Sequence, residues 1–99
     1  MFVAVYRYKL KPGTEADFAK DWAEVTQRGI AEGKSLGSIL GRAQDGTWVA
    51  IARWPTKDQR DNWFASIPID GARARIRDGI ETWIDDLEVE IVSDLSVPG

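Results

Sequence analysis

Asp45-Gly46 sets the geometry of the middle of this chain. An Asp-Gly pair between two strands is typical of a two-residue hairpin turn, because both residues tolerate the positive φ angles that such a turn needs. Residues 47–54 are rich in β-branched and aromatic side chains, and residues 36–43 form the other candidate strand. We therefore expect two neighbouring antiparallel strands here, around which the rest of the chain must pack.

A further strand is expected near each end of the chain. Residues 1–10 are β-branched and aromatic, and both faces of this segment begin with apolar side chains, which indicates a strand that is covered on both sides. In residues 87–95 the apolar Leu87 and Val89 alternate with Glu88, as in a strand with one solvated face. The chain thus has four candidate strands.

Two helices are expected between these strands. Thr14 begins the first, and Asp17 follows three residues later, a spacing that resembles a capping box. Thr56 begins the second, with Gln59 at the same spacing, and this helix is expected to run to about residue 65. One helix therefore follows the first strand, and the other follows the hairpin.

A further helical segment is predicted after Pro68, which ends the second helix. It begins at residue 69 or 71 and runs to Trp83, which is expected to pack in the core. The arginines within residues 72–77 are interpreted as a solvated helix face, with one of them pointing away from the other two. Asp21 and Glu24 of the first helix are also interpreted as parts of a solvated face.

The order β-α-β-β-α-β predicts a ferredoxin-like α+β fold, a four-stranded antiparallel sheet with helices on one face. The uncovered face would measure roughly 400 Å², a size at which an apolar patch is unusual on a monomer. Val3 and Val5 would contribute to it, together with either Ile39 or the pair Leu36 and Leu40. We therefore expect a homodimer that packs through the sheet face.

Composition excludes several classes of protein. The 99 residues suffice for a single domain, residues 1–99, with one core. The chain has no cysteine and no histidine, which removes disulfides, thiolate nucleophiles, the commonest general base and the commonest metal ligand, so no metal site is expected. The net charge of −3 and the pI of about 4.9 argue against a nucleic-acid partner. No apolar run is long enough for a membrane span, so we expect a cytoplasmic protein with no membrane partner.

The stretches KLKPGTEADFAKDW and SLGSILGRAQDGTWVAIARWPTKDQRDNW resemble the antibiotic biosynthesis monooxygenase (ABM) family of dimeric α/β barrels. The resemblance covers nearly the whole chain. Its most distinctive part is the step Trp54-Pro55-Thr56 from a strand into a helix that carries a further tryptophan, Trp63. The family fold agrees with the fold and the dimer derived above. One branch of the family oxidises phenolic, polyketide-like compounds to quinones with dioxygen and without metal or prosthetic group, so the resemblance implies a monooxygenase without cofactors that acts on an aromatic small molecule.

That branch implies roles for five residues of this chain. Trp63 would form a wall of an apolar site by stacking, and Tyr6 would hydrogen-bond a substrate oxygen. Arg73, or Arg77 one turn later, would hold a phenolate or a carboxylate. Gln59, one turn before Trp63, would take the amide role seen in this branch. No side chain is assigned as the catalytic base, which leaves water, a buried carboxylate or the substrate itself.

Haem-degrading members of the family give a different comparison. This chain keeps their helical tryptophan at Trp63, but it has Tyr6 in place of their asparagine and Arg73 in place of their iron-binding histidine. Because arginine does not give up its proton to bind iron, the resemblance does not imply haem degradation.

Two interpretations without catalysis stay open: a binder of small molecules, and a dimerisation module whose tryptophans only build the core.

Overall fold

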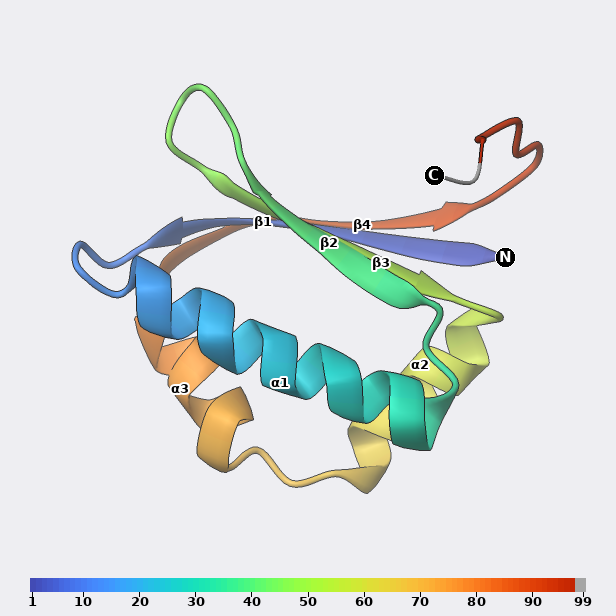
Figure 1. Ribbon diagram of the computed structural model, residues 1–99, viewed down its shortest axis with the longest axis horizontal. Helices are drawn as coiled ribbons and strands as arrows, with labels where there is room; N and C mark the ends of the chain where they lie inside the picture. The colour runs from blue at the N-terminus through green and yellow to red at the C-terminus, as the bar shows by residue number, and fades with distance from the viewer. Residues whose placement is uncertain (98–99) are drawn as a thin grey trace.

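A four-stranded antiparallel sheet and three helices form two layers in a computed structural model that describes residues 1–97 (Figure 1). Residues 98 and 99, which the expected single domain includes, lie outside the described part. The elements are β1 (Phe2–Leu10), α1 (Glu15–Gly33), β2 (Gly37–Arg42), β3 (Trp48–Trp54), α2 (Lys57–Ser66), α3 (Gly71–Gly79) and β4 (Ile80–Glu90). The predicted ferredoxin-like α+β fold is confirmed.

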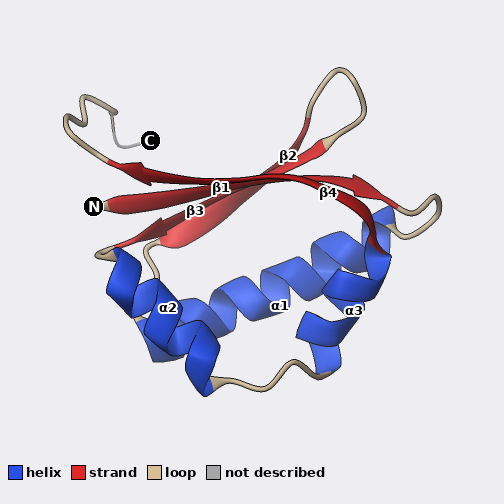
Figure 2. Cartoon of the chain, turned by 180° about the vertical axis from the view of Figure 1, so that it is seen from behind, coloured by secondary structure: helices blue, strands red, loops and turns tan. Residues whose placement is uncertain are grey.

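The sheet has the strand order β2-β3-β1-β4, so β3 and β4 both pair with β1. β1 and β3 run antiparallel, with Phe2 opposite Trp54 and Tyr8 opposite Trp48. Because side chains alternate between the two faces of a strand, these four aromatic residues share the face toward the helices. Figure 2 shows α1, α2 and α3 together on that face of the sheet.

Two buried clusters fill the space between the sheet and the helices. Their buried members are Phe2, Ala4, Trp54 and Trp63 in one cluster, and Tyr8, Phe18 and Ala50 in the other. Tyr6 packs against both clusters. It therefore lies at their junction, on the strand in the middle of the molecule.

The two expected helix caps have different outcomes. The Thr56 hydroxyl accepts the backbone N–H of Gln59 at 3.1 Å, so the cap of α2 is confirmed. The Thr14 hydroxyl instead donates to the Lys11 carbonyl at 2.6 Å and makes no cap bond to α1. The Thr14 hydroxyl is therefore bonded to the turn before α1 and not to the helix, and the capping-box prediction for Asp17 is wrong.

Within residues 1–97 no helix has the length and the apolar character that a membrane crossing requires.

The boundary between α3 and β4 differs from the prediction. The helix ends at Gly79 and the strand begins at Ile80, so Trp83 lies on a strand, opposite Tyr8. The spacing of Ile76, Ile80 and Trp83 fits a helix, but pairing with the edge of β1 satisfies the backbone groups of this segment and decides its structure. Trp83 is 48% exposed and not part of the core.

β4 also ends before the predicted residue 95. Its last strand residue is Glu90, and the Ile91 N–H donates to the Met1 carbonyl at 2.9 Å. β1 begins at Phe2, so the described residues after Ile91 have no strand residue of β1 beside them. The alternating pattern therefore extends further along the sequence than the pairing that a strand requires.

The hairpin between β2 and β3 is present, but its turn is longer than two residues. The Gly46 N–H donates to the Ala43 carbonyl at 3.0 Å, and in this turn Gly46 alone has a positive φ, of 88°. The Asp45 carboxylate accepts hydrogen bonds from the N–H and the hydroxyl of Thr47, at 3.0 and 2.7 Å. Asp45 thus holds the turn with its side chain and does not adopt the left-handed conformation of the predicted turn.

The second face of the sheet carries no helix among the described residues (Figure 2). Its side chains include the apolar residues Val3, Val5, Ile39, Ile51, Leu87 and Val89. Ile39 is 64% exposed and Leu87 is 56% exposed. Leu40 packs on the helix side, so of the two predicted choices it is Ile39 that belongs to this open face.

Candidate functional site

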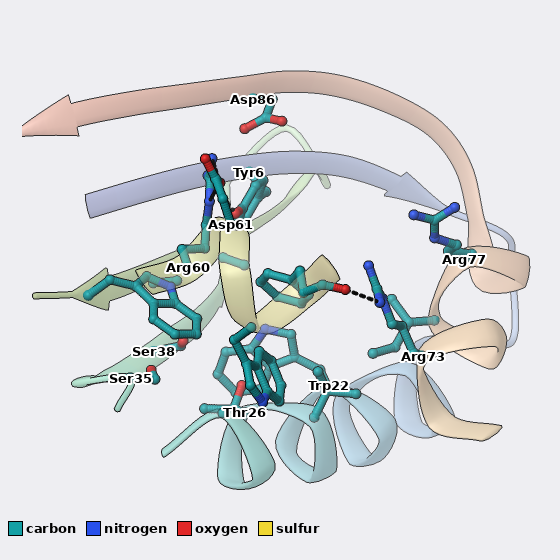
Figure 3. A pocket seen from close by; sticks show the side chains of 18 of the residues that line it. Tyr6, Trp22, Thr26, Ser35, Ser38, Arg60, Asp61, Arg73, Arg77 and Asp86 are labelled. Carbon is teal, nitrogen blue, oxygen red and sulfur yellow. Dashed lines mark hydrogen bonds and ion pairs between the residues drawn. The ribbon is translucent and has the colours of Figure 1, made fainter. Parts of the chain in front are cut away.

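A cavity of about 380 Å³ lies between the sheet and the three helices (Figure 3). This volume falls within the range of ~300 to 1,000 Å³ that is usual for small-molecule sites. Seven aromatic residues line it: Tyr6, Tyr8, Trp22, Trp54, Trp63, Phe64 and Trp83. An apolar, ring-lined space of this size is suited to a flat aromatic ligand.

Small residues stand where larger ones would fill this space. Ala50 and Ala52 of β3 line the cavity from the sheet side, and Gly29 lines it from α1. Ser35 and Ser38 add short polar side chains near the start of β2. Protein interiors are usually closely packed, so a ring-lined space of this volume is a candidate site for a ligand.

Trp63 is held in place by α1 and forms part of the cavity wall. It is 6% exposed, and its indole N–H donates to Glu32 Oε1 at 3.3 Å. Its ring lies so close to the backbone of Gly33 that a Cβ there would stand 2.5 Å from Trp63 Cγ. The sequence left open whether Trp63 belongs to the core or to a pocket, and in the structure it does both.

Arg60 of α2 reaches the hydroxyl of Tyr6 at the edge of the cavity. Its Nη1 donates to Tyr6 Oη at 3.3 Å, its Nη2 to Glu88 Oε1 at 2.9 Å, and its Nε to Asp61 Oδ1 at 2.9 Å. A guanidinium only donates, so the Tyr6 oxygen accepts this bond. The hydroxyl proton of Tyr6 is therefore available to another acceptor, such as an oxygen atom of a ligand.

Burial raises the pKa of Tyr6 above its ordinary value, although the charge and the hydrogen bond of Arg60 oppose this rise. Tyr6 is consequently protonated at neutral pH and acts as a hydrogen-bond donor. The hydrogen bond from Arg60 is the main cause that lowers the pKa of Asp61. A carboxylate with a lowered pKa is a weak base, so Asp61 is a poor candidate for proton abstraction.

Arg73 and Arg77 line the cavity from α3. Arg73 Nη1 donates to the carbonyl groups of Phe64 and Ile67, both at 3.1 Å, and its guanidinium lies 5.0 Å from the centre of the Phe64 ring. Burial lowers the pKa of Arg73, and the nearby charge of Arg77 lowers it further. Figure 3 shows the two arginines on the same side of the cavity. Arg73 therefore ties α3 to the end of α2 while it also lines the site.

Four of the five predicted site residues come together at this cavity, and Gln59 is the exception. Tyr6, Trp63, Arg73 and Arg77 line it, whereas Gln59 does not, even though it lies one turn before Trp63. Arg60 takes the position on α2 that the prediction gave to Gln59. Sequence reasoning missed Arg60, although its spacing of three residues from Trp63 places both on one face of the helix.

Trp54 lines the cavity, but its indole nitrogen is itself buried and inaccessible. Trp54 is 3% exposed, and its Nε1 has no hydrogen-bond partner among residues 1–97. Leaving a buried donor unpaired costs free energy, and the packing of this ring against Trp63 and Phe64 offsets that cost. The sequence could not have indicated this group, because the burial of Trp54 depends on α2.

The acidic residues do not form a metal centre. Within residues 1–97, no group of three or more acidic side chains is arranged so that it could hold a metal ion. The Asp21 carboxylate accepts hydrogen bonds from Arg75 Nε and Nη2 at 3.0–3.1 Å. Asp21 is 8% exposed, so its interpretation as part of a solvated face is wrong, whereas the Arg75 side chain is exposed as predicted.

The chain has the fold of the antibiotic biosynthesis monooxygenase structures, and the resemblance found in the sequence is confirmed at the level of the fold. No family model matches the chain, and no curated protein matches it.

SnoaB, a cofactor-independent oxygenase from Streptomyces nogalater, has a TM-score of 0.79 and 19% identity over 95% of each chain. A provisionally assigned antibiotic biosynthesis monooxygenase from Chloroflexus aurantiacus J-10-fl has a TM-score of 0.76 and 12% identity over 98% of each chain. Another, from Caulobacter crescentus CB15, has a TM-score of 0.78 and 16% identity over 93% of this chain and 90% of its own. Identities this low establish the shared fold, so an activity has to be argued from the site.

Proposed function

We propose that this protein binds an aromatic, phenolic small molecule in the cavity and oxidises it to a quinone with dioxygen, without a cofactor. The observation that carries the proposal is the cavity of about 380 Å³, lined by seven aromatic residues and by the hydroxyl of Tyr6. The shared fold with SnoaB, a cofactor-independent oxygenase, supports the same reaction class.

The reaction balances without an external reductant. A phenol and one molecule of dioxygen give a quinone and one molecule of water. One atom of dioxygen becomes the new quinone oxygen, and the other leaves as water with the phenolic proton and one ring hydrogen. The four electrons that reduce dioxygen all come from the ring. Reaction begins when the phenol loses its proton, because the electron-rich phenolate then donates to dioxygen.

The side chains would favour this first step by stabilising the phenolate. Tyr6 would donate its hydroxyl proton in a hydrogen bond to the phenolate oxygen, and Arg60 would keep Tyr6 in that orientation. With a ligand bound, Trp63 and the other rings would reduce the contact of this hydrogen bond with water, which would strengthen it. No side chain is assigned as the base, because Asp61 is paired with Arg60 and is a weak one.

Oxygen consumption with a panel of hydroxylated naphthalenes and anthracenes tests the proposal. We expect one quinone per dioxygen consumed, measured by absorbance and mass spectrometry, with no loss of rate when a chelator is present.

Tyr6→Phe should lower kcat by about 100-fold, because it removes a hydrogen bond that is strongest to the developing charge. Trp63→Phe should raise KM, whereas Trp48→Phe should change neither constant, because Trp48 does not line the cavity.

A non-catalytic binder is the second candidate. It is favoured by the absence of histidine and by the pairing of Asp61 with Arg60, which leave the cavity without a strong base. Quenching of tryptophan fluorescence by the phenol panel, together with no oxygen consumption by any member, would select the binder and reject the oxygenase.

A further inference from the structure

The cationic side chains around the cavity are neutralised at one end only. At the α2 end, Arg60 is bonded to both Asp61 and Glu88 at 2.8–2.9 Å. Lys57 approaches the same two carboxylates at 3.5 Å. This end holds two positive and two negative charges, and Asp86 adds another carboxylate to the lining nearby. The net charge of this end therefore does not attract a permanently charged ligand group, whereas the Tyr6 hydroxyl can still donate a hydrogen bond to a ligand oxygen.

The α3 end differs, because its two arginines have no carboxylate partner. Among residues 1–97, neither Arg73 nor Arg77 forms an ion pair. They are four residues apart on α3, a spacing at which like charges repel. Figure 3 shows Asp61 and Asp86 away from them, on the side of Tyr6 and Arg60. The repulsion between the arginines is relieved when an anion binds to both.

Arg73 is also built to hold a planar anion. Two backbone carbonyls fix its Nη1, so the guanidinium is oriented before any ligand binds. Its Nε and Nη2 donate to no protein acceptor in the described part of the chain. A planar guanidinium edge with two donors matches the two oxygens of a carboxylate. Arg60 offers no such edge, since both its Nε and Nη2 already bind carboxylates.

We propose that the ligand of this cavity is an aromatic carboxylic acid, whose carboxylate binds Arg73 and Arg77 while its phenolic oxygen meets Tyr6. The inference rests on the proposed function, because it takes the same cavity as the substrate site. It adds the substrate class and the orientation: the ring lies between the aromatic walls, with the charged group at α3 and the reacting hydroxyl at β1.

Paired probes separate this inference from the proposed function. A hydroxynaphthoic acid and its primary amide share ring, hydroxyl and shape, and they differ at neutral pH by one negative charge. Tryptophan fluorescence titration should show the acid binding at least about tenfold more tightly than the amide, since charge-assisted hydrogen bonds are the stronger ones. The preference for the acid should decrease as salt is added.

Arg77→Gln is the informative variant, because Arg77 is exposed and its side chain forms no hydrogen bond or ion pair with any residue from 1 to 97. The affinities of the acid and the amide should converge in this variant. Lys20→Gln removes one positive charge from the exposed side of α1, and Lys20 does not line the cavity, so the preference for the acid should persist. Arg73→Lys keeps the charge without the planar edge and should lose part of the preference.

Three outcomes have distinct meanings. Equal affinity of both probes for the natural chain would overturn the carboxylate inference and leave the aromatic site standing. Convergence in Lys20→Gln as well as in Arg77→Gln would attribute the preference to the overall charge of the protein and also overturn it. No binding of either probe would overturn the aromatic site itself, and with it the proposed function.

Discussion

Trp63 packs directly against Gly29 and Gly33 of α1, and this contact fixes one wall of the cavity. A methyl group on Gly33 would stand 2.5 to 2.9 Å from three atoms of Trp63. Alanine normally stabilises a helix over glycine by about 0.5–1 kcal/mol. Overpacking costs about 1–3 kcal/mol, so we expect Gly33→Ala to lower the free energy of unfolding by the difference. Urea unfolding followed by tryptophan fluorescence measures this change.

Gly41→Ala provides the control for this prediction. Gly41 lies in β2, and a Cβ built on it meets nothing within 4 Å. The same chemical change should therefore leave the stability of the fold nearly unchanged. If Gly33→Ala were as stable as the natural chain and bound the phenol panel equally well, Trp63 could not be fixed by this contact.

Single residues of the site were predictable where local spacing decides their position. Trp63 lines the cavity from a helix face that its spacing indicates, whereas Arg73 and Arg77 were placed at the site by the resemblance, because their spacing indicated a solvated face. The hydrogen bond between Tyr6 and Arg60 was not predictable, because it joins residues 54 positions apart. Whether Arg60 or Gln59 reaches inward depends on the rotation of α2, which is set by the packing of Trp63 on α1.

At the scale of the elements, α3 is attached to α1 by the bond between Arg75 and Asp21. Asp21 is 8% exposed and accepts three hydrogen-bond contacts from the Arg75 guanidinium. The Arg75 side chain is 59% exposed and stays solvated without Asp21, so the loss should be comparable with that of the stronger exposed ion pairs. We expect Asp21→Asn to lower the melting temperature by roughly 4 to 8 °C, the shift that corresponds to about 1 kcal/mol in a domain of this size.

Glu24→Gln is the matched control for Asp21→Asn. Glu24 lies on the same helix, is exposed, and forms no ion pair among the described residues. Its substitution should move the melting temperature by less than about 2 °C, as is usual for surface changes in a domain of this size. A shift of equal size in both variants, followed by circular dichroism, would mean that net charge matters and that the bond between the helices does not.

Elements were predictable where a local signal begins or ends them. The Thr56 cap fixes the start of α2, and a hairpin forms around Asp45-Gly46, although its turn is longer than the predicted two residues. The start of β4 was not predictable from local spacing, because residues 76–83 satisfy a helical period. The edge of β1 decides the structure there, and a strand partner 70 or more positions away leaves no local signal.

At the scale of the whole molecule, the two faces of the sheet differ: one borders the cavity, and the other exposes apolar side chains. The helix-facing side encloses the cavity, while the open face has Val5 opposite Leu87 and Ile51 opposite Ile39. Arg7 and Asp85 form an ion pair at one end of this open face. An apolar centre beside a neutralised pair is the pattern of an interface, where a hydrophobic core has a polar rim.

We predict that a second copy of the chain covers this open face and that the protein is a homodimer in solution. Because a twofold interface repeats the same patch on both copies, one charged substitution places two like charges in it. Leu87→Glu should therefore convert the dimer to a monomer, measured by sedimentation velocity, with the secondary structure retained. Ile69→Glu is the control, since Ile69 is 51% exposed on the helix side of the molecule. A natural chain that sediments as a monomer, or a dimer that survives Leu87→Glu, would contradict pairing through the sheet face.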